Sequence, residues 1–538
     1  MSAMQRHADG AWYGPPMSDL RPSGDLWNIF EKHVRRAPET LWGVQYDGQL
    51  TTRSSRELHV EARKLAAAFH RLGCRPGDAI VAQLPNCREG AVSFLAAMAL
   101  GLVYVPVVHI YGPAELAYII GNSRARLLIV PEKWHNIDFA GRLDQLPKLE
   151  GLQHIVMVGS TGSRRPDVHA WDSLVATANE AGLASLQEAD PGSRCLIVYT
   201  SGTTAMPKGA MHSHQSLSAE AFQNHDYLQH IDNKAVFVGA PAGHIGPITM
   251  MARQCVFDIA GVYLDRWEAG VAADLIEQFR AGWTVGVPFH LNTLLPFAAA
   301  GRIPTLEMYV IGGTAVPPAL VEEADKAGIR ACRSYGSTEH PTIAQCFKTH
   351  TLLQRSRTDG PLGSGCSVRL VDDDDRDAPA GQPGEILSRG PDQFLGYFDT
   401  ALNADAFTRD GWFRTGDIGV IDAGGFLTVV DRKKDILIRG GENISAKEVE
   451  DILAHHDAVL EAAVIGWPDA TYGERVGAFV RLRPGSMLDL DAVQRHFAVK
   501  GVAKQKFPER LVIVEDFPRN PSGKILKTEL RVRARAMI

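Results

Sequence analysis

Residues 195–209 read CLIVYTSGTTAMPKG, an apolar run that leads into a loop of small and hydroxyl-bearing residues. The apolar run predicts a buried strand, and the loop after it holds glycines, hydroxyls and one cation, Lys208. Backbone N–H groups can converge on an anion where no bulky side chain intervenes, and hydroxyls and a lysine add donors and charge. We therefore expect a phosphate-binding loop formed by Thr200, Ser201, Gly202, Thr203, Thr204 and Lys208.

The size and composition of the chain restrict its class. A chain of 538 residues exceeds what one hydrophobic core can hold, so we expect two or more domains. The formal net charge of −6 disfavours a general nucleic-acid-binding surface, and we expect no nucleic-acid partner. The seven cysteines include no C-x-x-C pair, which favours reduced thiols in a cytoplasmic protein over disulfides or a zinc site.

One uncharged stretch, residues 91–108, is long enough to suggest a membrane span. Gly101 and Pro106 interrupt it, and its composition changes from alanine-rich to valine- and tyrosine-rich. These features predict a buried helix followed by a buried strand instead. We therefore expect no transmembrane segment, and the N-terminal residues lack the apolar core of a signal peptide.

Helix-like and strand-like segments alternate from about residue 54 to residue 310, which predicts α/β architecture with mixed or largely parallel sheets flanked by helices. From about residue 360 to 430 short strands alternate with turn residues, which predicts a small antiparallel β subdomain. After residues 431–435 a strand, an amphipathic helix and further strands follow. We expect a large N-terminal domain over residues 1–432 and a compact α+β C-terminal domain over residues 433–538.

Four further short segments could carry chemistry. Residues 335–339, YGSTE, combine an aromatic ring, hydroxyls and a carboxylate, which could stack on a base, contact a phosphate and hold Mg²⁺. Asp417 follows a tight turn, where its carboxylate could accept both hydroxyls of a ribose. Arg432 and Lys524 lie in polar turns, where a charge is more often simply solvated. Neither the Walker A nor the Rossmann pattern occurs, so the phosphate loop belongs to neither of these nucleotide folds.

The order and spacing of these segments resemble the core motifs of the adenylate-forming superfamily. That group contains acyl- and aryl-CoA synthetases, adenylation domains of peptide synthetases and firefly-type luciferases. The resemblance covers nearly the whole chain from about residue 50, and six motifs in one order are far more specific than any one of them. The motifs are YTSGTTAMPKG, IGGTAVPP, YGSTE, GWFRTGD, DRKKDILIRGGENISAKEVE and PRNPSGKILK.

The resemblance implies that the protein uses ATP, Mg²⁺ and coenzyme A, and it implies roles for matching residues. The loop of residues 200–209 would hold the β- and γ-phosphates, and Tyr335 would stack on the adenine. Glu339 would be the metal ligand, and Lys524 would reach the substrate carboxylate and the α-phosphate. The implied ATP-binding residues are Thr200, Ser201, Gly202, Thr203, Thr204, Lys208, Gly312, Gly313, Thr314, Ser334, Tyr335, Gly336, Ser337, Thr338, Asp417, Arg432 and Lys524. The implied catalytic residues are Lys524, Thr200, Glu339 and His244.

The resemblance also implies an acid pocket, a thiol channel and a hinge. His244 matches a gate beside the acid pocket, although a core histidine bonded to backbone would explain it as well. Gly440, Gly441 and Glu442 would line the channel for coenzyme A, and Lys434 matches the hinge of a mobile C-terminal domain. The implied acid-binding residues are His244, Ile245, Gly246, Gly312, Gly336, Ile343 and Ala344. Because these are mostly small or apolar, we expect an apolar acid, which could be medium-chain, aromatic or bulky and cyclic.

These features predict an ATP-dependent acid–CoA ligase that works through an acyl-AMP intermediate. The carboxylate and ATP are both anions, so cations and donors must screen their charge before they can react. Two alternatives stay open: an acid–AMP ligase that loads a carrier protein or an amine, and a non-adenylating member that kept the fold. A homodimer is compatible with each. Two positions depart from the family pattern, because Ala205 replaces a common glycine and Ser445-Ala446 replace an aromatic–proline pair.

Overall fold

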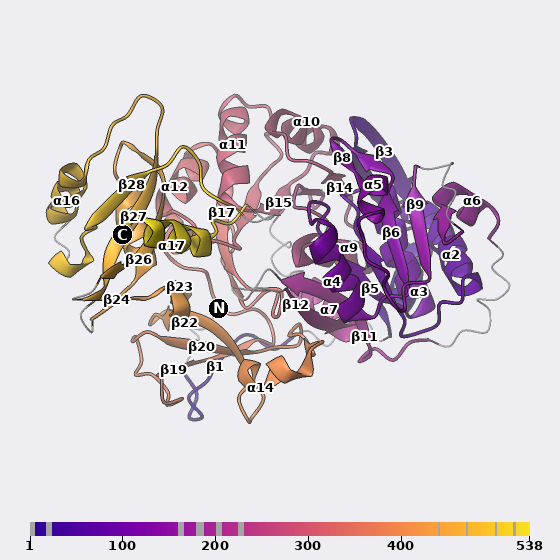
Figure 1. Ribbon diagram of the computed structural model, residues 1–538, viewed down its shortest axis with the longest axis horizontal. Helices are drawn as coiled ribbons and strands as arrows, with labels where there is room; N and C mark the ends of the chain where they lie inside the picture. The colour runs from indigo at the N-terminus through magenta and orange to yellow at the C-terminus, as the bar shows by residue number, and fades with distance from the viewer. Residues whose placement is uncertain are drawn as a thin grey trace.

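The computed structural model describes residues 6–17, 24–159, 166–178, 188–200, 207–223, 231–439, 442–469, 472–500, 503–519 and 523–537. The side chains of Lys434, Glu442 and Asn443 lie outside this description. Helices and strands alternate through the larger part of the chain, and the C-terminal residues, drawn in yellow, form a lobe at one end of the molecule (Figure 1). The predicted α/β class, with a large N-terminal sheet domain and a small C-terminal one, is confirmed.

Two eight-stranded sheets form the larger part of the protein. The first has the order β10-β9-β6-β4-β5-β11-β12-β21 and is parallel except at β12, which pairs antiparallel with β11 and β21. Its strands are Ala79–Ala82 (β4), Val103–Pro106 (β5), Leu127–Pro131 (β6), His154–Val158 (β9), Val168–Ala170 (β10), Arg194–Thr200 (β11), Lys208–Ser213 (β12) and Gly396–Tyr397 (β21). A separate two-stranded hairpin consists of Lys133–Trp134 (β7) and Ile137–Asp138 (β8).

The second sheet has the order β18-β17-β16-β15-β13-β14-β2-β3. Its central strands are parallel, whereas the edge strands β3 and β18 are antiparallel to their neighbours. Its strands are Leu41–Tyr46 (β2), Gln49–Ser54 (β3), Val236–Val238 (β13), Gly261–Leu264 (β14), Trp283–Gly286 (β15), Met308–Ile311 (β16), Arg330–Tyr335 (β17) and Ala344–Gln345 (β18).

Helices fill the space between the two sheets and cover their outer faces. Successive strand residues point to opposite faces, so Ile80 of β4 joins the central core while Val81 joins the outer core of the first sheet. The central core includes helices Leu26–Arg36 (α1), Ser55–Arg71 (α2), Arg88–Leu100 (α3), Trp171–Ala176 (α6), His214–Gln223 (α7) and Ile245–Val256 (α9). The outer cores include Pro113–Ser123 (α4), Phe139–Leu143 (α5), Ala269–Phe279 (α10), Pro288–Ala299 (α11) and Pro318–Lys326 (α12).

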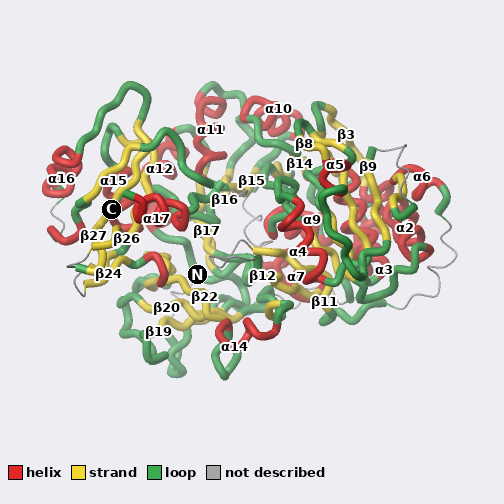
Figure 2. Tube along the Cα trace, in the orientation of Figure 1, coloured by secondary structure: helices red, strands yellow, loops and turns green. Residues whose placement is uncertain are grey.

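A third sheet of five antiparallel strands has the order β1-β19-β20-β22-β23. Figure 2 shows this part of the chain mainly as strands and loops, with the short helix α14 at its edge. Its strands are Trp12–Tyr13 (β1), Ser367–Val371 (β19), Gly384–Arg389 (β20), Phe413–Ile421 (β22) and Leu427–Arg432 (β23). The helices that precede or connect these strands in the sequence are Leu352–Arg357 (α13), Thr400–Leu402 (η2) and Asn403–Ala406 (α14). The strand β1 was not predicted, because two residues carry no periodicity.

The C-terminal lobe has its own sheet, in which β25, β24, β27 and β26 are neighbours and β28 pairs with β27. Ser445 donates from its hydroxyl to the Val430 carbonyl oxygen at 3.2 Å, which ties this lobe to the third sheet. Its elements are Lys433–Asp435 (η3), Leu437–Arg439 (β24), Glu442–Ile444 (β25), Ala446–Ala454 (α15), Val459–Asp469 (β26), Gly473–Leu482 (β27), Leu490–Val499 (α16), Lys504–Lys506 (η4), Arg510–Ile513 (β28) and Lys527–Ala536 (α17).

The uncharged stretch at residues 91–108 forms most of helix α3 and then strand β5, as predicted. Both elements are buried inside the protein rather than exposed to a lipid phase. Of the helices that the structure describes, none combines the length and the apolar character that a membrane span requires. All seven cysteines are buried free thiols.

Gly243 precedes helix α9 and packs against the end of strand β5, so Gly243→Ala should destabilise the fold. A Cβ at this position would lie 2.2 Å from the Val108 backbone nitrogen, and a backbone atom cannot rotate away. We expect the free energy of unfolding to fall by about 1–3 kcal/mol, the usual range for overpacking. Gly270→Ala in α10 is the control, because no described atom lies within 4 Å of its added Cβ. Urea unfolding measures both variants, and equal stability would contradict this packing.

Candidate active site

The β11–β12 hairpin carries the predicted phosphate loop. Thr200 ends β11 and pairs with Lys208, which begins β12, and the Thr200 hydroxyl lies 3.4 Å from the Lys208 carbonyl oxygen. The Lys208 ammonium lies 5.3 Å from the centroid of the Tyr397 ring, which comes from the adjacent strand β21. Residues 201–206 lie outside the described residues; they include the predicted phosphate-binding residues Ser201, Gly202, Thr203 and Thr204, and also Ala205.

The segment after β17 forms a tight turn. A Cβ at Gly336 would lie 1.9 Å from the Pro341 carbonyl oxygen, so only glycine lets the chain close here. The backbone N–H of Ser337 donates to the His340 carbonyl oxygen at 2.9 Å, and its hydroxyl accepts from the His340 N–H at 3.2 Å. His212 Nε2 lies 2.8 Å from the carbonyl oxygen of Thr338 and so fixes the tip of the turn to β12.

Glu339, the predicted metal ligand, is connected to Lys208 through one ring. The Tyr397 hydroxyl donates to Glu339 Oε1 at 2.8 Å, and the face of the same ring receives the Lys208 ammonium. The tyrosine thus holds a carboxylate and a cation near each other without letting them pair directly. Tyr397 was not among the predicted site residues, since the strand that carries it is two residues long and follows no motif.

Tyr335, Asp417 and Arg432 meet where the second and third sheets adjoin. Asp417 and Arg432 are opposite each other on β22 and β23, and Arg432 Nε lies 2.9 Å from Asp417 Oδ1. The Tyr335 hydroxyl donates to Asp417 Oδ2 at 2.9 Å. Tyr335 and Asp417 are buried, whereas Arg432 is partly exposed. Burial lowers the pKa of Arg432, but the charge of Asp417, followed by the smaller effects of Tyr335, Asp435 and Glu339, raises it by more, so the pKa of the guanidinium is raised on balance.

The predicted residues Gly312, Gly313 and Thr314 follow β16, beside β17. A Cβ at Gly312 would lie 2.7 Å from the carbonyl oxygen and the hydroxyl of Ser334, so these two predicted residues are in close contact. Because β16 and β17 are parallel neighbours, their carboxyl ends meet at one edge of the sheet. Open α/β sheets commonly bind ligands at such an edge.

His244 occupies the N-cap position of α9. Its Nε2 atom is buried and, among the described residues, finds no hydrogen-bond partner. Burial lowers the pKa of the imidazole to about 4, so the ring is neutral at pH 7. A neutral ring with a buried nitrogen facing no protein partner suits a position beside a ligand, and its role as a gate stays a prediction.

A cavity of about 100 Å³ lies between α9, α7 and the second sheet. The predicted acid-binding residues Ile245 and Gly246 line it, and so does the predicted ATP-binding residue Ser334. Ile343 and Ala344 are not among the lining residues, because both are fully buried in the core of the third sheet. The cavity therefore lies next to the turn after β17, which also contributes Pro341 and Thr342 to its wall.

Two charged residues that the sequence analysis missed, Glu220 of α7 and Arg253 of α9, line this cavity. Each is 3% exposed, and Arg253 Nη2 lies 3.9 Å from Glu220 Oε1. The Thr342 hydroxyl donates to Glu220 Oε1 at 3.0 Å. A signal was present in the sequence, since each is the only Asp, Glu, Lys or Arg in its helix. A lone charge in an uncharged helix is a buried polar group that needs an explanation.

Behind Glu220 lies a buried network of His340, Asp392 and Cys366. His340 Nε2 lies 3.1 Å from Asp392 Oδ1, and its Nδ1 lies 2.9 Å from the Ser388 hydroxyl. The three side chains could group around a metal ion, and they are the one such group among the described residues. Both ring nitrogens of His340 already contact hydrogen-bonding partners, so we interpret the group as a structural hydrogen-bond network.

The predicted site residues beyond Arg432 lie in the C-terminal lobe. Lys524 is partly buried in a turn before α17, where the Arg519 guanidinium donates to the Gly523 carbonyl oxygen at 3.0 Å. Lys434 lies in η3 and Glu442 begins β25, which pairs with β24. The remaining two, Gly440 and Gly441, lie outside the described residues.

Glu220 should make the protein less stable as the pH rises. Burial and the charge of Asp392 raise the pKa of Glu220 from 4.5 to about 8 in the folded state. Between these values the folded protein binds more protons than the unfolded chain, so the free energy of unfolding falls as pH increases. Glu220→Gln keeps a neutral polar group and should remove this loss.

Thermal unfolding of wild type and Glu220→Gln from about pH 5 to about pH 8 measures the effect. The melting temperature of the variant relative to wild type should rise steadily with pH. Glu323→Gln, at an exposed position of α12, should show no such trend. A pH-independent difference for Glu220→Gln would show that the carboxyl does not hold its proton in the folded state.

Comparison with known proteins identifies the family. The model of the AMP-binding enzyme family matches residues 30–398, and that of the AMP-binding enzyme C-terminal domain matches residues 448–524. The medium-chain fatty-acid–CoA ligase of Escherichia coli is 33% identical over 94% of this chain and 90% of its own length. The fatty acid–[acyl-carrier-protein] ligase ScoC of Streptomyces coeruleorubidus is 30% identical over 93% of this chain and 95% of its own.

A solved structure shows the same architecture. ATP-bound MatB from Rhodopseudomonas palustris has a TM-score of 0.83 and 27% identity, over 95% of this chain and 99% of its own. The family models, the fold and the six ordered motifs agree. The chain therefore belongs to the adenylate-forming superfamily of AMP-binding enzymes, within its branch of AMP-forming acid–thiol ligases.

Proposed function

We propose that the protein is an ATP-dependent acid–CoA ligase. The carboxylate of the acid attacks the α-phosphorus of ATP, forming an acyl-AMP and releasing pyrophosphate, and the thiol of coenzyme A then attacks the acyl carbon and releases AMP. The observation that carries this proposal is the grouping of Lys208 and Glu339 around Tyr397, and of Asp417 with Tyr335, in segments that adjoin a cavity. A cation, a carboxylate suited to Mg²⁺ and a carboxylate suited to ribose are what binding and screening ATP requires.

Each group has a proposed task in the first step. Lys208 and the loop around it hold the β- and γ-phosphates, Tyr335 stacks on the adenine, and Asp417 with Arg432 binds the ribose hydroxyls. Glu339 fits a magnesium ligand because its carboxylate is partly exposed, and Mg²⁺ prefers one or two carboxylates together with phosphates. When bound, the ion supplies positive charge that screens the phosphates.

The second step requires a different arrangement of the C-terminal lobe. We propose that residues 433–538 rotate as a domain about Lys434, which brings Lys524 to the acid and α-phosphate for the first step. In the other arrangement Gly440, Gly441 and Glu442 face the site and form the channel for coenzyme A. Rotation is needed because the first step requires a lysine in the space that the thiol must cross in the second.

The acid and the cellular location are proposed from the same structure. Ile245, Met250 and Val310 give the cavity apolar walls, which supports an acid with an apolar body, either medium-chain or cyclic. His244 stands as a gate at the start of α9. The seven free cysteines support a reducing, cytoplasmic environment.

The second candidate is an acid–AMP ligase that loads a carrier protein. Its support is the relative from Streptomyces coeruleorubidus, which is named for that acceptor. Incubating the enzyme with ATP, octanoate and either free coenzyme A or an acyl-carrier protein separates the two. We expect AMP and an acyl thioester with coenzyme A, and a thioester formed only on the carrier protein would reverse the assignment.

Arg432 should contribute to ATP binding more than other arginines of the same sheet. Arg432→Gln removes the cation beside Asp417, and a charged hydrogen bond of this kind contributes about 1.5–3 kcal/mol. We expect the KM for ATP to rise at least about tenfold in pyrophosphate release. Arg414→Gln is the control, since Arg414, which lies on β22, pairs with the exposed Asp375 instead of Asp417. Equal KM values for the two variants would remove Arg432 from the ATP site.

Lys524→Ala should slow adenylation far more than thioester formation. Removing one preorganised cation costs roughly 10²- to 10³-fold in rate when it acts on the transition state. Pyrophosphate release measures the first step, and attack of coenzyme A on supplied octanoyl-AMP measures the second. Lys500→Ala, at an exposed position after α16, should leave both unchanged. Equal losses in both steps for Lys524→Ala would refute its proposed position.

A further inference from the structure

The chain enters the C-terminal lobe at η3, and ion pairs hold it on both sides of Lys434. The Lys433 ammonium lies 3.1 Å from Glu385 Oε2 on β20, so this residue is tied to the third sheet. Two residues later, Asp435 Oδ1 lies 2.6 Å from Arg531 Nη2 of α17, so that residue is tied to the C-terminal lobe. We therefore expect a change in the angle between the lobes to occur at Lys434, the residue between the two ion pairs.

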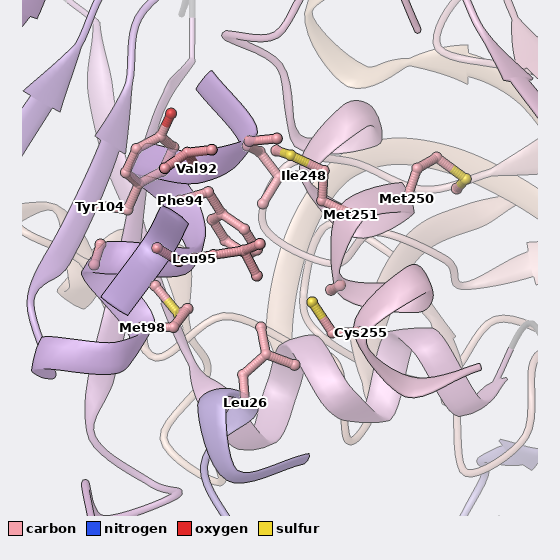
Figure 3. Packing of buried hydrophobic residues seen from close by; sticks show 14 of the residues in the cluster. Leu26, Val92, Phe94, Leu95, Met98, Tyr104, Ile248, Met250, Met251 and Cys255 are labelled. Atoms are coloured by element: carbon pink, nitrogen blue, oxygen red, sulfur yellow. The ribbon is translucent and has the colours of Figure 1, made fainter. Parts of the chain in front are cut away.

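The two lobes do not share an apolar core. Figure 3 shows the core between the two large sheets, where side chains such as Phe94 of α3 and Ile248 of α9 pack together. Each apolar cluster of this kind among the described residues lies wholly on one side of Lys434. Domains joined without a common core commonly move relative to each other, so single polar contacts between them carry weight.

One such contact is a hydrogen bond that joins the lobes just before the hinge. The Ser445 hydroxyl donates to the Val430 carbonyl oxygen at 3.2 Å and also accepts from the Glu448 N–H at 3.1 Å, which makes Ser445 the N-cap of α15. Helix α15 packs against β23, the strand that contains Val430. The hydroxyl therefore uses its donor across the lobe boundary and its acceptor within its own lobe.

The same hydroxyl lies near a buried carboxyl of the third sheet. Asp431 follows Val430 on β23, and its Oδ1 accepts from the Arg432 N–H at 2.7 Å. Burial raises the pKa of Asp431, while the Ser445 hydroxyl and, more weakly, the charge of Lys527 oppose the rise. Both of these groups belong to the C-terminal lobe, so they stabilise the carboxylate only while the lobe keeps this arrangement.

Ser445 is also a position at which the sequence departs from the family pattern, since an aromatic residue is common there. An aromatic ring has no short hydroxyl that can cap α15 and reach the Val430 carbonyl oxygen at the same time. The departure therefore gives this chain a bond between its lobes that the common residue would lack.

We propose that Ser445 is a positioning residue that holds the C-terminal lobe in the arrangement shown by the structure and so sets the balance between the two steps of the reaction. The inference rests on the proposed function, in which the lobe rotates about Lys434 between the steps. Because Val430 precedes the hinge and Ser445 follows it, rotation separates them and breaks the bond. A bond made in one arrangement only favours that arrangement, and loss of one hydrogen bond should change the ratio of the two arrangements about two- to tenfold.

Ser445→Ala removes the bond, and the two steps are measured separately on the full-length enzyme. ATP–pyrophosphate exchange with octanoate reports the first step, and attack of coenzyme A on supplied octanoyl-AMP reports the second. Both are expressed as kcat/KM, since apparent affinity falls with the fraction of protein in the competent arrangement. The ratio of the two values should change about two- to tenfold, with one value falling and the other rising. Damage to the fold would lower both, and damage to the thiol channel would lower the second alone. A result in which neither value rises would overturn the proposal.

Two variants separate the bond between the lobes from the helix cap. Ser445→Thr keeps a hydroxyl and should retain the wild-type ratio. Asp489→Ala removes another cap of the same lobe, because the Asp489 carboxylate accepts from the Ala492 N–H at 2.7 Å at the start of α16. That bond does not cross the lobe boundary, so the ratio should stay unchanged. An equal change of ratio in Asp489→Ala and Ser445→Ala would show that loss of a cap explains the effect, and would overturn the proposal.

Ser445→Asp covers the case in which Ser445→Ala does not fold. Aspartate caps a helix about as well as serine does, but its ionised carboxylate donates no hydrogen bond. It also places a second carboxylate near Asp431, so the ratio should change in the same direction as in Ser445→Ala and by at least as much. A wild-type ratio for Ser445→Asp would contradict the proposal while leaving the ligase assignment intact. Absence of both steps in the wild-type enzyme with every acid tried would instead count against the proposed function.

Discussion

Asp417 is a buried carboxylate whose hydrogen-bond partners come from both the second and the third sheet. Because burying a charge is costly without such partners, this residue constrains how the two sheets pack together. An ionised carboxylate away from water needs a cation and hydrogen-bond donors. Arg432 supplies the cation from the next strand, and Tyr335 supplies a donor from a different sheet. The two sheets are therefore joined at the point where the carboxyl end of β17 opens into the turn that carries Glu339. A ligand bound to Asp417 would therefore lie next to that turn.

Tyr397 likewise connects two parts of the protein, the first sheet and the turn that carries Glu339. Its hydroxyl is bonded to Glu339 and its ring face lies under Lys208, so the first sheet contributes a cation and the turn contributes a carboxylate. Direct pairing of Lys208 with Glu339 would neutralise both groups and leave nothing for phosphate or metal. By keeping the two groups apart, the tyrosine would leave their charges available to the proposed phosphate and metal ligands. The site thus depends on two tyrosine hydroxyls that reach across sheet boundaries.

The sequence predicted the elements and motifs well, because each depends on neighbours in the chain. Helix α2 begins at a capping box formed by Ser54 and Glu57, and the break between α3 and β5 follows Gly101, whose φ is +66°. Tyr397 and Glu220 were missed because their hydrogen-bond partners, Glu339 and Thr342, are 58 and 122 residues away in the sequence. Arg253 was missed because its partners lie on other elements, Glu220 on α7 and Trp283 on β15. Strand β1 was missed for the same reason, since its two residues acquire strand geometry only by pairing with β19. The roles of Ser201, Gly202, Thr203 and Thr204 stay predictions.

The polar network behind the cavity links the proposed acid site to the proposed metal ligand Glu339 through a short length of backbone. Asp392 accepts from the Thr342 N–H at 3.2 Å and contacts His340, and the Thr342 hydroxyl in turn donates to Glu220. These bonds fix both ends of the segment from His340 to Thr342, and Glu339 immediately precedes it. Because buried hydrogen-bond networks resist displacement, we expect these bonds to hold Glu220, in the wall of the cavity, in place relative to the segment that follows Glu339. In the proposed reaction, an in-line attack needs its reacting groups placed to within a fraction of an ångström, and this network would hold them in place from residues that are not among the proposed ligands of ATP or of the activated carboxylate.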